Sequence, residues 1–240
     1  MSEHISRKEL KQDKIKETIE HGAEAVISHG QFTMIVIVAA LVAVVAYGGW
    51  RFYVDRKTVQ ASLAFDEGMK AYQGRIGGAP NPADPDDRVY PNDNARVSDA
   101  FQKFSAVADK YSSTNPGKLA SYYSALCLED LERHNQAIEE LKKISGGSDK
   151  ELSAMARYQM AVIHARTGKP DDAIKLFRAL ADKPSVLVPR PLALLELARV
   201  LRKTDPQEAI TVYQQIKKEF PEATIADEAD RGLEALSPKS

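Results

Sequence analysis

The side chains that could carry out chemistry in this chain are few and lie far apart along the sequence. No histidine pairs with another histidine, a cysteine or a carboxylate at a metal-ligand spacing, and the five histidines are His4, His21, His29, His134 and His164. The single cysteine, Cys127, lies in an apolar helical stretch, where a thiol is usually buried and inert. Because no nucleophile, base and orienting residue can be assembled, we expect a protein without catalytic residues, metal or cofactor.

Three further ligand classes are disfavoured by pattern or charge. Gly77-Gly78 lies among prolines and precedes neither a strand nor a helix start, unlike a phosphate-binding loop. The aspartates at 84, 86, 87 and 93 lack the closing glutamate of a 12-residue calcium loop. The 33 Lys and Arg residues nearly balance the 34 Asp and Glu residues, so the chain has no clustered basic footprint for nucleic acid.

The strongest pattern is an internal repeat with a period in the mid-thirties. Each repeat has an alanine, a large apolar residue four positions later and another apolar residue three positions after that. The alanines are Ala100, Ala137, Ala173 and Ala209; the large residues are Phe104, Leu141, Phe177 and Tyr213; the third set is Val107, Ile144, Leu180 and Ile216. This spacing marks one face of a helix in a repeated helical hairpin, and it predicts an all-α solenoid.

Start and stop residues divide this region into about four helical hairpins and a last helix. Gly168 and Pro170, for example, predict the end of one helix and the start of the next. The expected pairs are 58–72 with 97–111, 119–132 with 136–144, 151–167 with 170–181, and 190–203 with 206–220, followed by a capping helix at 225–236. Residues 73–95 are rich in Gly, Pro and Asp, so we expect a long loop inside the first hairpin.

An apolar segment precedes the repeats. Phe32 to Trp50 is about nineteen residues without a charge, which as a helix spans roughly 28 Å of a hydrocarbon core about 30 Å thick. A buried core helix and a cleaved signal peptide are the alternatives. The preceding 31 residues form a long, highly charged segment that is about as acidic as basic, unlike a short positive leader, so we predict an uncleaved single-pass anchor. Basic residues flank both sides, and the charge count leaves the orientation nearly undecided.

The domain plan follows from these segments. We expect a charged N-terminal helical tail at 1–31, a transmembrane helix at 32–50, a juxtamembrane linker at 51–57, repeats at 58–222 and a C-terminal capping helix and tail at 223–240. The tail carries a narrow apolar stripe along a predicted helix at 6–28. It either lies on the membrane or a partner helix, or is a solvated helix that leads into the span.

The repeat residues resemble those of the tetratricopeptide repeat (TPR) family. The small, large, small, aromatic and apolar positions of that repeat are matched in the second unit by Ala125, Leu128, Ala137, Leu141 and Ile144. The third unit matches with Ala161, Ala173, Phe177 and Leu180, and the fourth with Ala198, Leu201, Ala209, Tyr213, Ile216 and Pro221. The resemblance covers residue 58 to the C-terminus and implies a right-handed α-solenoid that binds protein partners.

The order of tail, span and repeats resembles the YfgM-type ancillary subunits of the SecYEG translocon. That resemblance implies a bacterial inner-membrane protein with its N-terminus inside and its repeats in the periplasm. It also implies a chaperone-like role beside the Sec translocon or a periplasmic chaperone. The proline-rich insertion after Tyr72 departs from that family.

In TPR arrays the first helix of each hairpin lines the concave surface. Transferred to this register, the resemblance implies a groove for an extended or unfolded polypeptide, apolar in three units and basic in the fourth. Its residues would be Phe65, Met69, Tyr72, Tyr122, Leu126, Glu129, Met155, Tyr158, Val162, Leu195, Arg199 and Arg202. The alternative is that several of these side chains are core residues. The groove lacks the Lys and Asn clamp with which some TPR proteins bind acidic chaperone tails.

The leading functional hypothesis is therefore a membrane-anchored TPR adaptor that holds a client protein near the bilayer. A structural subunit of an envelope or secretion assembly is the alternative. A cytoplasm-facing docking receptor is a weaker one, which the charge count leaves open.

Overall fold

The computed structural model describes residues 30–81, 83–84, 86–222 and 224–237. The chain divides into two compact units, Met1–Arg56 and Lys57–Ser240, which we describe separately. The predicted tail helix at 6–28 lies outside the described residues.

The first unit contains the apolar part of α2, a helix that extends over Gly30–Tyr72. Its large apolar side chains are exposed along their length, from Phe32 at 72% to Trp50 at 59%. Among the described residues, α2 is the one helix long and apolar enough to cross a membrane. The residues at 51–57, which we expected as a linker, continue this helix because they include neither Gly nor Pro to end it.

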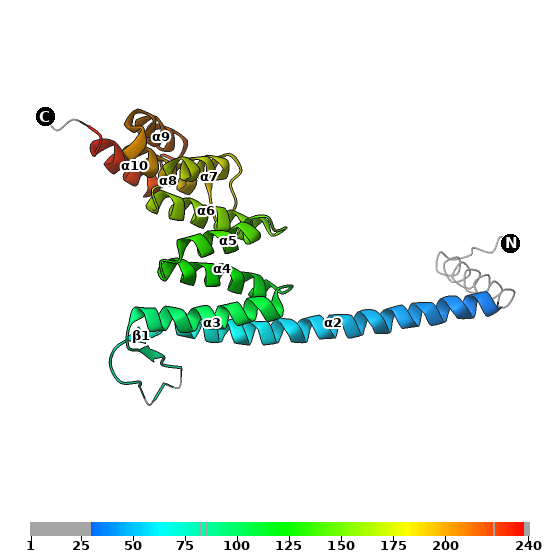
Figure 1. Cartoon of the computed structure of the whole chain (residues 1–240). Coiled ribbons are helices and arrows are strands. Elements are labelled where there is room, and N and C mark those ends of the chain that lie inside the picture. The colour runs from blue at the N-terminus through cyan, green and yellow to red at the C-terminus, as the bar shows by residue number, and fades with distance from the viewer. Residues whose placement is uncertain (1–29, 82, 85, 223, 238–240) are drawn as a thin grey trace, which may run out of the picture. The chain divides into compact units, whose positions relative to one another are not determined.

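The second unit is the predicted all-α solenoid. From residue 57, α2 pairs with α3, and the later helices follow one another as antiparallel neighbours (Figure 1). The helices are α3 (Asp93–Tyr111), α4 (Asn115–Asp130), α5 (His134–Ser145), α6 (Lys150–Arg166), α7 (Pro170–Asp182), α8 (Arg190–Thr204), α9 (Pro206–Glu219) and α10 (Thr224–Glu234). This arrangement confirms the fold class and the order of hairpins predicted from the repeat.

Local sequence accounts for the helix ends. The side chains of Thr114, Asp149 and Asp205 each accept a hydrogen bond from a backbone N–H in the first turn of the helix that follows. Pro170 and Pro206 begin α7 and α9, where the missing N–H costs nothing. From α3 onward these signals keep the connections between successive helices short, and short connections favour antiparallel neighbours.

The core is built by large residues that face positions with almost no side chain. The four repeat alanines are fully buried, and so are Phe104, Leu141 and Phe177. At Gly68 a Cβ atom would lie only 2.6 Å from the ring of Phe104, and at Gly232 only 2.4 Å from the ring of Tyr213. Neighbouring helices therefore approach closely because one of them offers no side chain at the contact.

An aromatic cluster joins the first hairpin to the second. Tyr123 of α4 lies 5.3 Å from Phe104 of α3 and 5.5 Å from Phe65 of α2, between ring centroids. Tyr72 and Tyr122 are each 6.0 Å from Tyr123. Most of these pairs are tilted or edge-to-face, geometries in which aromatic pairs contribute beyond the area they bury.

The expected loop lies between α2 and α3, and its described residues include two short strands. Strands β1 (Arg75–Ile76) and β2 (Val89–Tyr90) pair in parallel at its base. Asp87 accepts hydrogen bonds from Arg75 Nη2 at 2.6 Å and from the Asn81 N–H at 2.7 Å, and these donors lower the pKa of Asp87. The Tyr90 hydroxyl donates to Asp99 of α3 at 2.6 Å.

We predict that Gly68→Ala destabilises the solenoid although alanine is the better helix former. The new methyl group would overlap the fully buried Phe104 ring, and overpacking of this kind costs about 1–3 kcal/mol. Urea unfolding followed by circular dichroism measures the change. Gly146→Ala is the matched control, because the nearest atoms to its Cβ lie at 3.9 Å. Equal stability of the two variants would contradict the close contact.

Candidate partner-binding surfaces

The second unit presents two distinct faces. The first helices of successive hairpins share contacts. α4 contacts α6, and Met155, Tyr158 and Val162 of α6 pack against a core cluster that includes residues of α8. The Tyr72 hydroxyl of α2 donates to Asp130 of α4 at 3.1 Å, which continues this row to the first hairpin. We call this side, formed by α2 from residue 57, α4, α6 and α8, the inner face. The side formed by α3, α5, α7 and α9 is the outer face.

The predicted groove residues of the first hairpin are only partly accessible. Phe65, Met69 and Tyr72 are half-buried against the core around Phe104. The Arg96 guanidinium lies 5.4 Å from the centre of the Tyr72 ring and also donates to the Tyr72 carbonyl. Burial and the neighbouring Asp130 raise the pKa of the Tyr72 hydroxyl. These three side chains therefore already have intramolecular partners.

Two of the predicted groove residues are core residues in this structure. Tyr122 is 7% exposed and Leu195 is 3% exposed, so neither can contact a partner without local rearrangement. Tyr122 packs with Ala125 and Leu128 under α5 and α6, and burial raises its pKa to about 12. Its neighbour Tyr123, one residue further round the helix, is the partly exposed ring.

Four of the predicted apolar residues do reach the surface on α4 and α6. Leu126 and Val162 are half-buried and occupy equivalent positions of their hairpins, while Met155 and Tyr158 are half-buried beside Val162. The Tyr158 ring packs edge-on against Phe177 at 5.8 Å between centroids, so its position is fixed by the core. We call Leu126, Met155, Tyr158 and Val162 the inner strip.

A buried carboxylate links α4 and α6 beside the inner strip. Glu129 is 5% exposed, and its Oε1 lies 2.6 Å from Arg166 Nη1. Gln159 of α6 donates a second hydrogen bond to the same carboxylate. Glu129 was expected to face a partner, but its hydrogen-bonding capacity is used between the two helices.

The predicted basic end of the groove is partly neutralised within the chain. Arg199 and Arg202 of α8 are both exposed. Arg199 Nη1 lies 2.6 Å from Glu196, and its other terminal nitrogen bonds Glu228 of α10. Of these two exposed arginines, Arg199 is therefore paired with glutamates of the same chain, whereas Arg202 makes no ion pair with the described residues.

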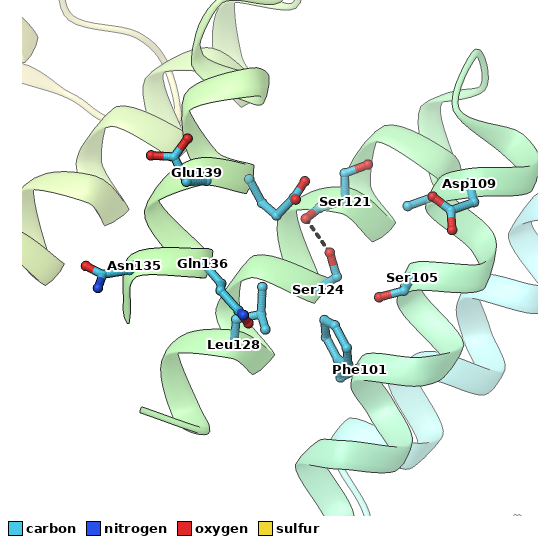
Figure 2. Close-up of a pocket in the computed structure, with 11 residues that line it drawn as sticks. Phe101, Ser105, Asp109, Ser121, Ser124, Leu128, Asn135, Gln136 and Glu139 are labelled. Atoms are coloured by element: carbon cyan, nitrogen blue, oxygen red, sulfur yellow. Dashed lines mark hydrogen bonds between the residues drawn. The ribbon is translucent and has the colours of Figure 1, made fainter. Parts of the chain in front are cut away.

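The outer face carries a pocket that the sequence did not predict. It has a volume of about 580 Å³, with α3 and α5 as walls and α4 as floor, and we call it the outer pocket (Figure 2). Phe101 and Leu128 give it an apolar base, and Ser105 and Asp109 face it from α3. Its wall residues come from positions of α3 and α5 that point away from the repeat core, and the repeat pattern does not describe such positions.

The titratable groups form no reactive constellation in the described part of the chain. No group of three or more His, Cys, Asp or Glu residues there could hold a metal ion. Cys127 is fully buried, and burial raises the pKa of its thiol to about 12. Burial also lowers the pKa of His164.

Comparison with known proteins identifies the repeat class. A family model described as a tetratricopeptide repeat-like domain matches residues 27–186, and one described as a tetratricopeptide repeat matches residues 158–224. No curated protein matches the chain. Similar solved structures include the nearly identical TPR-like repeats of a kinesin light chain from Podosopora anserina, which share 16% sequence identity with this chain and give a TM-score of 0.49. The match covers 60% of this chain and 78% of that one. A point variant of those repeats has 16% identity, a TM-score of 0.46 and coverages of 60% and 86%.

We predict that Arg166→Ala lowers the free energy of unfolding by about 1–3 kcal/mol, because it leaves the buried Glu129 carboxylate without its cation. Adding Glu129→Gln should recover part of the loss, since the uncompensated charge is then removed. Urea unfolding of the single and double variants measures both effects. Arg202→Ala is the control and should change stability by less than about 0.5 kcal/mol. A double variant no more stable than Arg166→Ala alone would argue against a buried ion pair.

Proposed function

Because the chain belongs to the tetratricopeptide repeat-like family, whose model matches residues 27–186, we propose that it is a membrane-anchored adaptor that binds an extended polypeptide. Repeats of this class act in protein–protein interaction and are generally not enzymes. The observation that carries the proposal is the inner strip. It places partly exposed apolar side chains from two successive hairpins on one face of the solenoid.

The inner strip suits a client that is bound with low sequence specificity. Its side chains are apolar and include Met155, whose flexible thioether adapts to different partner surfaces. Tyr158 adds a rigid ring held by Phe177, the kind of anchor that often dominates binding energy. Such a strip binds unfolded or extended segments with low sequence specificity, whereas a tight and specific client would need a deeper set of pockets.

The exposed apolar length of α2 supports anchoring in a bilayer. Between Phe32 and Tyr53 its large apolar side chains are more than half exposed, and no described segment covers them. A helix satisfies its own backbone hydrogen bonds, so this surface is stable when lipid surrounds it. Tyr47, Trp50 and Tyr53 gather at one end, where aromatic rings favour the headgroup layer. Anchoring would also raise the local concentration of the repeats at the membrane.

The resemblance to the YfgM-type subunits suggests a location. We propose that the chain is a bacterial inner-membrane protein with its N-terminus inside and its repeats in the periplasm. There it would bind emerging or unfolded clients beside the Sec translocon, or cooperate with a periplasmic chaperone.

Topology is the first prediction of this proposal. A reporter that is active only in the periplasm, fused after Ser240, should be active, and a reporter active only in the cytoplasm should be silent. Alkaline carbonate should leave the chain in the membrane pellet. Cytoplasmic activity would overturn the periplasmic role and favour a docking receptor that faces the cytoplasm. Release by carbonate would overturn the anchor itself.

Client binding gives the second prediction. Leu126→Ser with Val162→Ser should weaken binding of a reduced, unfolded model polypeptide by about tenfold or more, which corresponds to about 1.4 kcal/mol. The full chain in detergent micelles and fluorescence anisotropy provide the measurement, with thermal melting to exclude unfolding. Val186→Ser is the matched control, because Val186 is apolar, 84% exposed and outside the strip.

Two results would argue against a client-binding adaptor. One is unchanged affinity in the double variant with a normal melting temperature. The other is gentle detergent extraction that yields a discrete complex of fixed stoichiometry, which is the behaviour of a structural subunit of a larger assembly.

A further inference from the structure

The outer pocket is an open cavity that the proposed client-binding face does not use. Its walls are four side chains of α3 and four of α5, and α4 closes its floor (Figure 2). The α3 wall consists of Phe101, Ser105, Ala108 and Asp109, and the α5 wall of Asn135, Gln136, Glu139 and Glu140. Its volume of about 580 Å³ lies within the range of ligand pockets, about 300–1,000 Å³. Of the three helices that form the pocket, only α4 contributes to the inner strip, through Leu126, which does not line the pocket.

The lining of the outer pocket is acidic on both walls. Asp109 stands on the α3 wall, and Glu139 and Glu140 stand on the α5 wall, whereas the lining includes no lysine, arginine or histidine among the described residues. Asp109 is exposed and makes no ion pair with the described residues. Its carboxylate therefore gives up only hydration when a cation binds.

The other carboxylates are available to a competing cation. Glu140 pairs at 2.8 Å with Lys143, and Glu139 pairs at 2.9 Å with Lys142, in each case across one turn of the same exposed helix. Surface pairs of this kind are worth little because water screens them. Glu139 and Glu140 each border a further pocket that contains lysines, whereas Asp109 borders neither of these pockets. The Glu140 side chain is less exposed than that of Glu139, at 41% against 66%, so we assign the main role to Asp109 and Glu140.

The base of the pocket suits the stem of a long basic side chain. Phe101 and Ala108 are partly exposed and offer apolar surface, on which lysine and arginine stems pack while their charged ends remain hydrated. The guanidinium of Arg133 already lies 5.5 Å from the centre of the Phe101 ring, so this ring accepts a cation over its face within the protein itself. The side chains of Ser105, Asn135 and Gln136 make no hydrogen bond to the described residues and can bind a peptide backbone.

We propose that the outer pocket is a docking site for a basic polypeptide segment, which inserts a lysine or arginine between Asp109 and Glu140 and rests its stem on Phe101 and Ala108. The charge of the lining selects this occupant. Anionic lipid headgroups and nucleic acid would be repelled by the carboxylates, and no convergent group of ligands for a metal ion was found in the described chain. The site would let the protein hold a second partner while the inner strip remains free.

The test uses the full chain in detergent micelles and a fluorescent peptide of alternating lysine and alanine, with a glutamate–alanine peptide as the charge control. We expect the basic peptide to bind and the acidic one not to bind. Asp109→Asn with Glu140→Gln should weaken the basic peptide at least tenfold in an anisotropy titration. Glu222→Gln with Glu234→Gln makes the same change in net charge at exposed residues far from the pocket in sequence, and it should alter affinity less than twofold.

A second variant tests the cavity rather than its charge. Ser105→Trp fills the space beside Phe101 without altering any charge, and it should also abolish binding of the basic peptide. Leu126→Ser with Val162→Ser should leave this binding intact, so failure of the inner strip and failure of the outer pocket are separable. The proposal would be overturned if the two amide double variants lost equal affinity or if both peptides bound equally well. Full binding of the basic peptide by a folded Ser105→Trp protein would also overturn it. Melting curves confirm that each variant is folded.

Discussion

The solenoid depends on the contact of a large side chain with a position that has almost none. Phe104 needs the space that Gly68 leaves on α2, and Tyr213 needs the space that Gly232 leaves on α10. The buried alanines of each repeat serve the same purpose between neighbouring helices. No hairpin can bury its apolar face alone, so these close contacts let each unit stabilise the next. The spacing that these contacts impose decides which side chains the solenoid exposes.

The same packing decides which side chains remain for partners. On the inner face, Tyr72, Glu129 and Arg199 use their polar groups to join neighbouring helices. The inner strip consists of the apolar side chains on α4 and α6 that the core buries only partly. On the outer face, the space between α3 and α5 remains as a pocket with polar walls. The two faces therefore differ in chemistry, since the inner strip offers apolar side chains and the outer pocket offers polar and acidic ones.

Much of this architecture could be predicted because the repeat is specified locally. The alanine and large apolar positions gave the hairpins, and Pro170 and Pro206 gave helix starts that the structure confirms. Exposure of individual residues was harder to predict, because adjacent helical positions differ by about 100° and a shift of one position in the assumed register exchanges Tyr122 with Tyr123. The pairing of β1 with β2 depends on contacts such as Asp87 with Arg75, which composition alone does not indicate. The outer pocket arises from three helices together and leaves no periodic signal.

The inserted loop has a consequence for how such a chain can change. Its two ends are joined at the base, where the N–H of Arg75 donates to the carbonyl of Arg88 at 2.8 Å and the N–H of Gly77 to that of Tyr90 at 2.9 Å. Once the base is closed, doubling the length of the loop beyond it adds only about 0.6 kcal/mol of closure entropy. The segment between Gly78 and Asp86 is therefore a site at which sequence, or a whole folded module, can be added while the helices on either side keep their register.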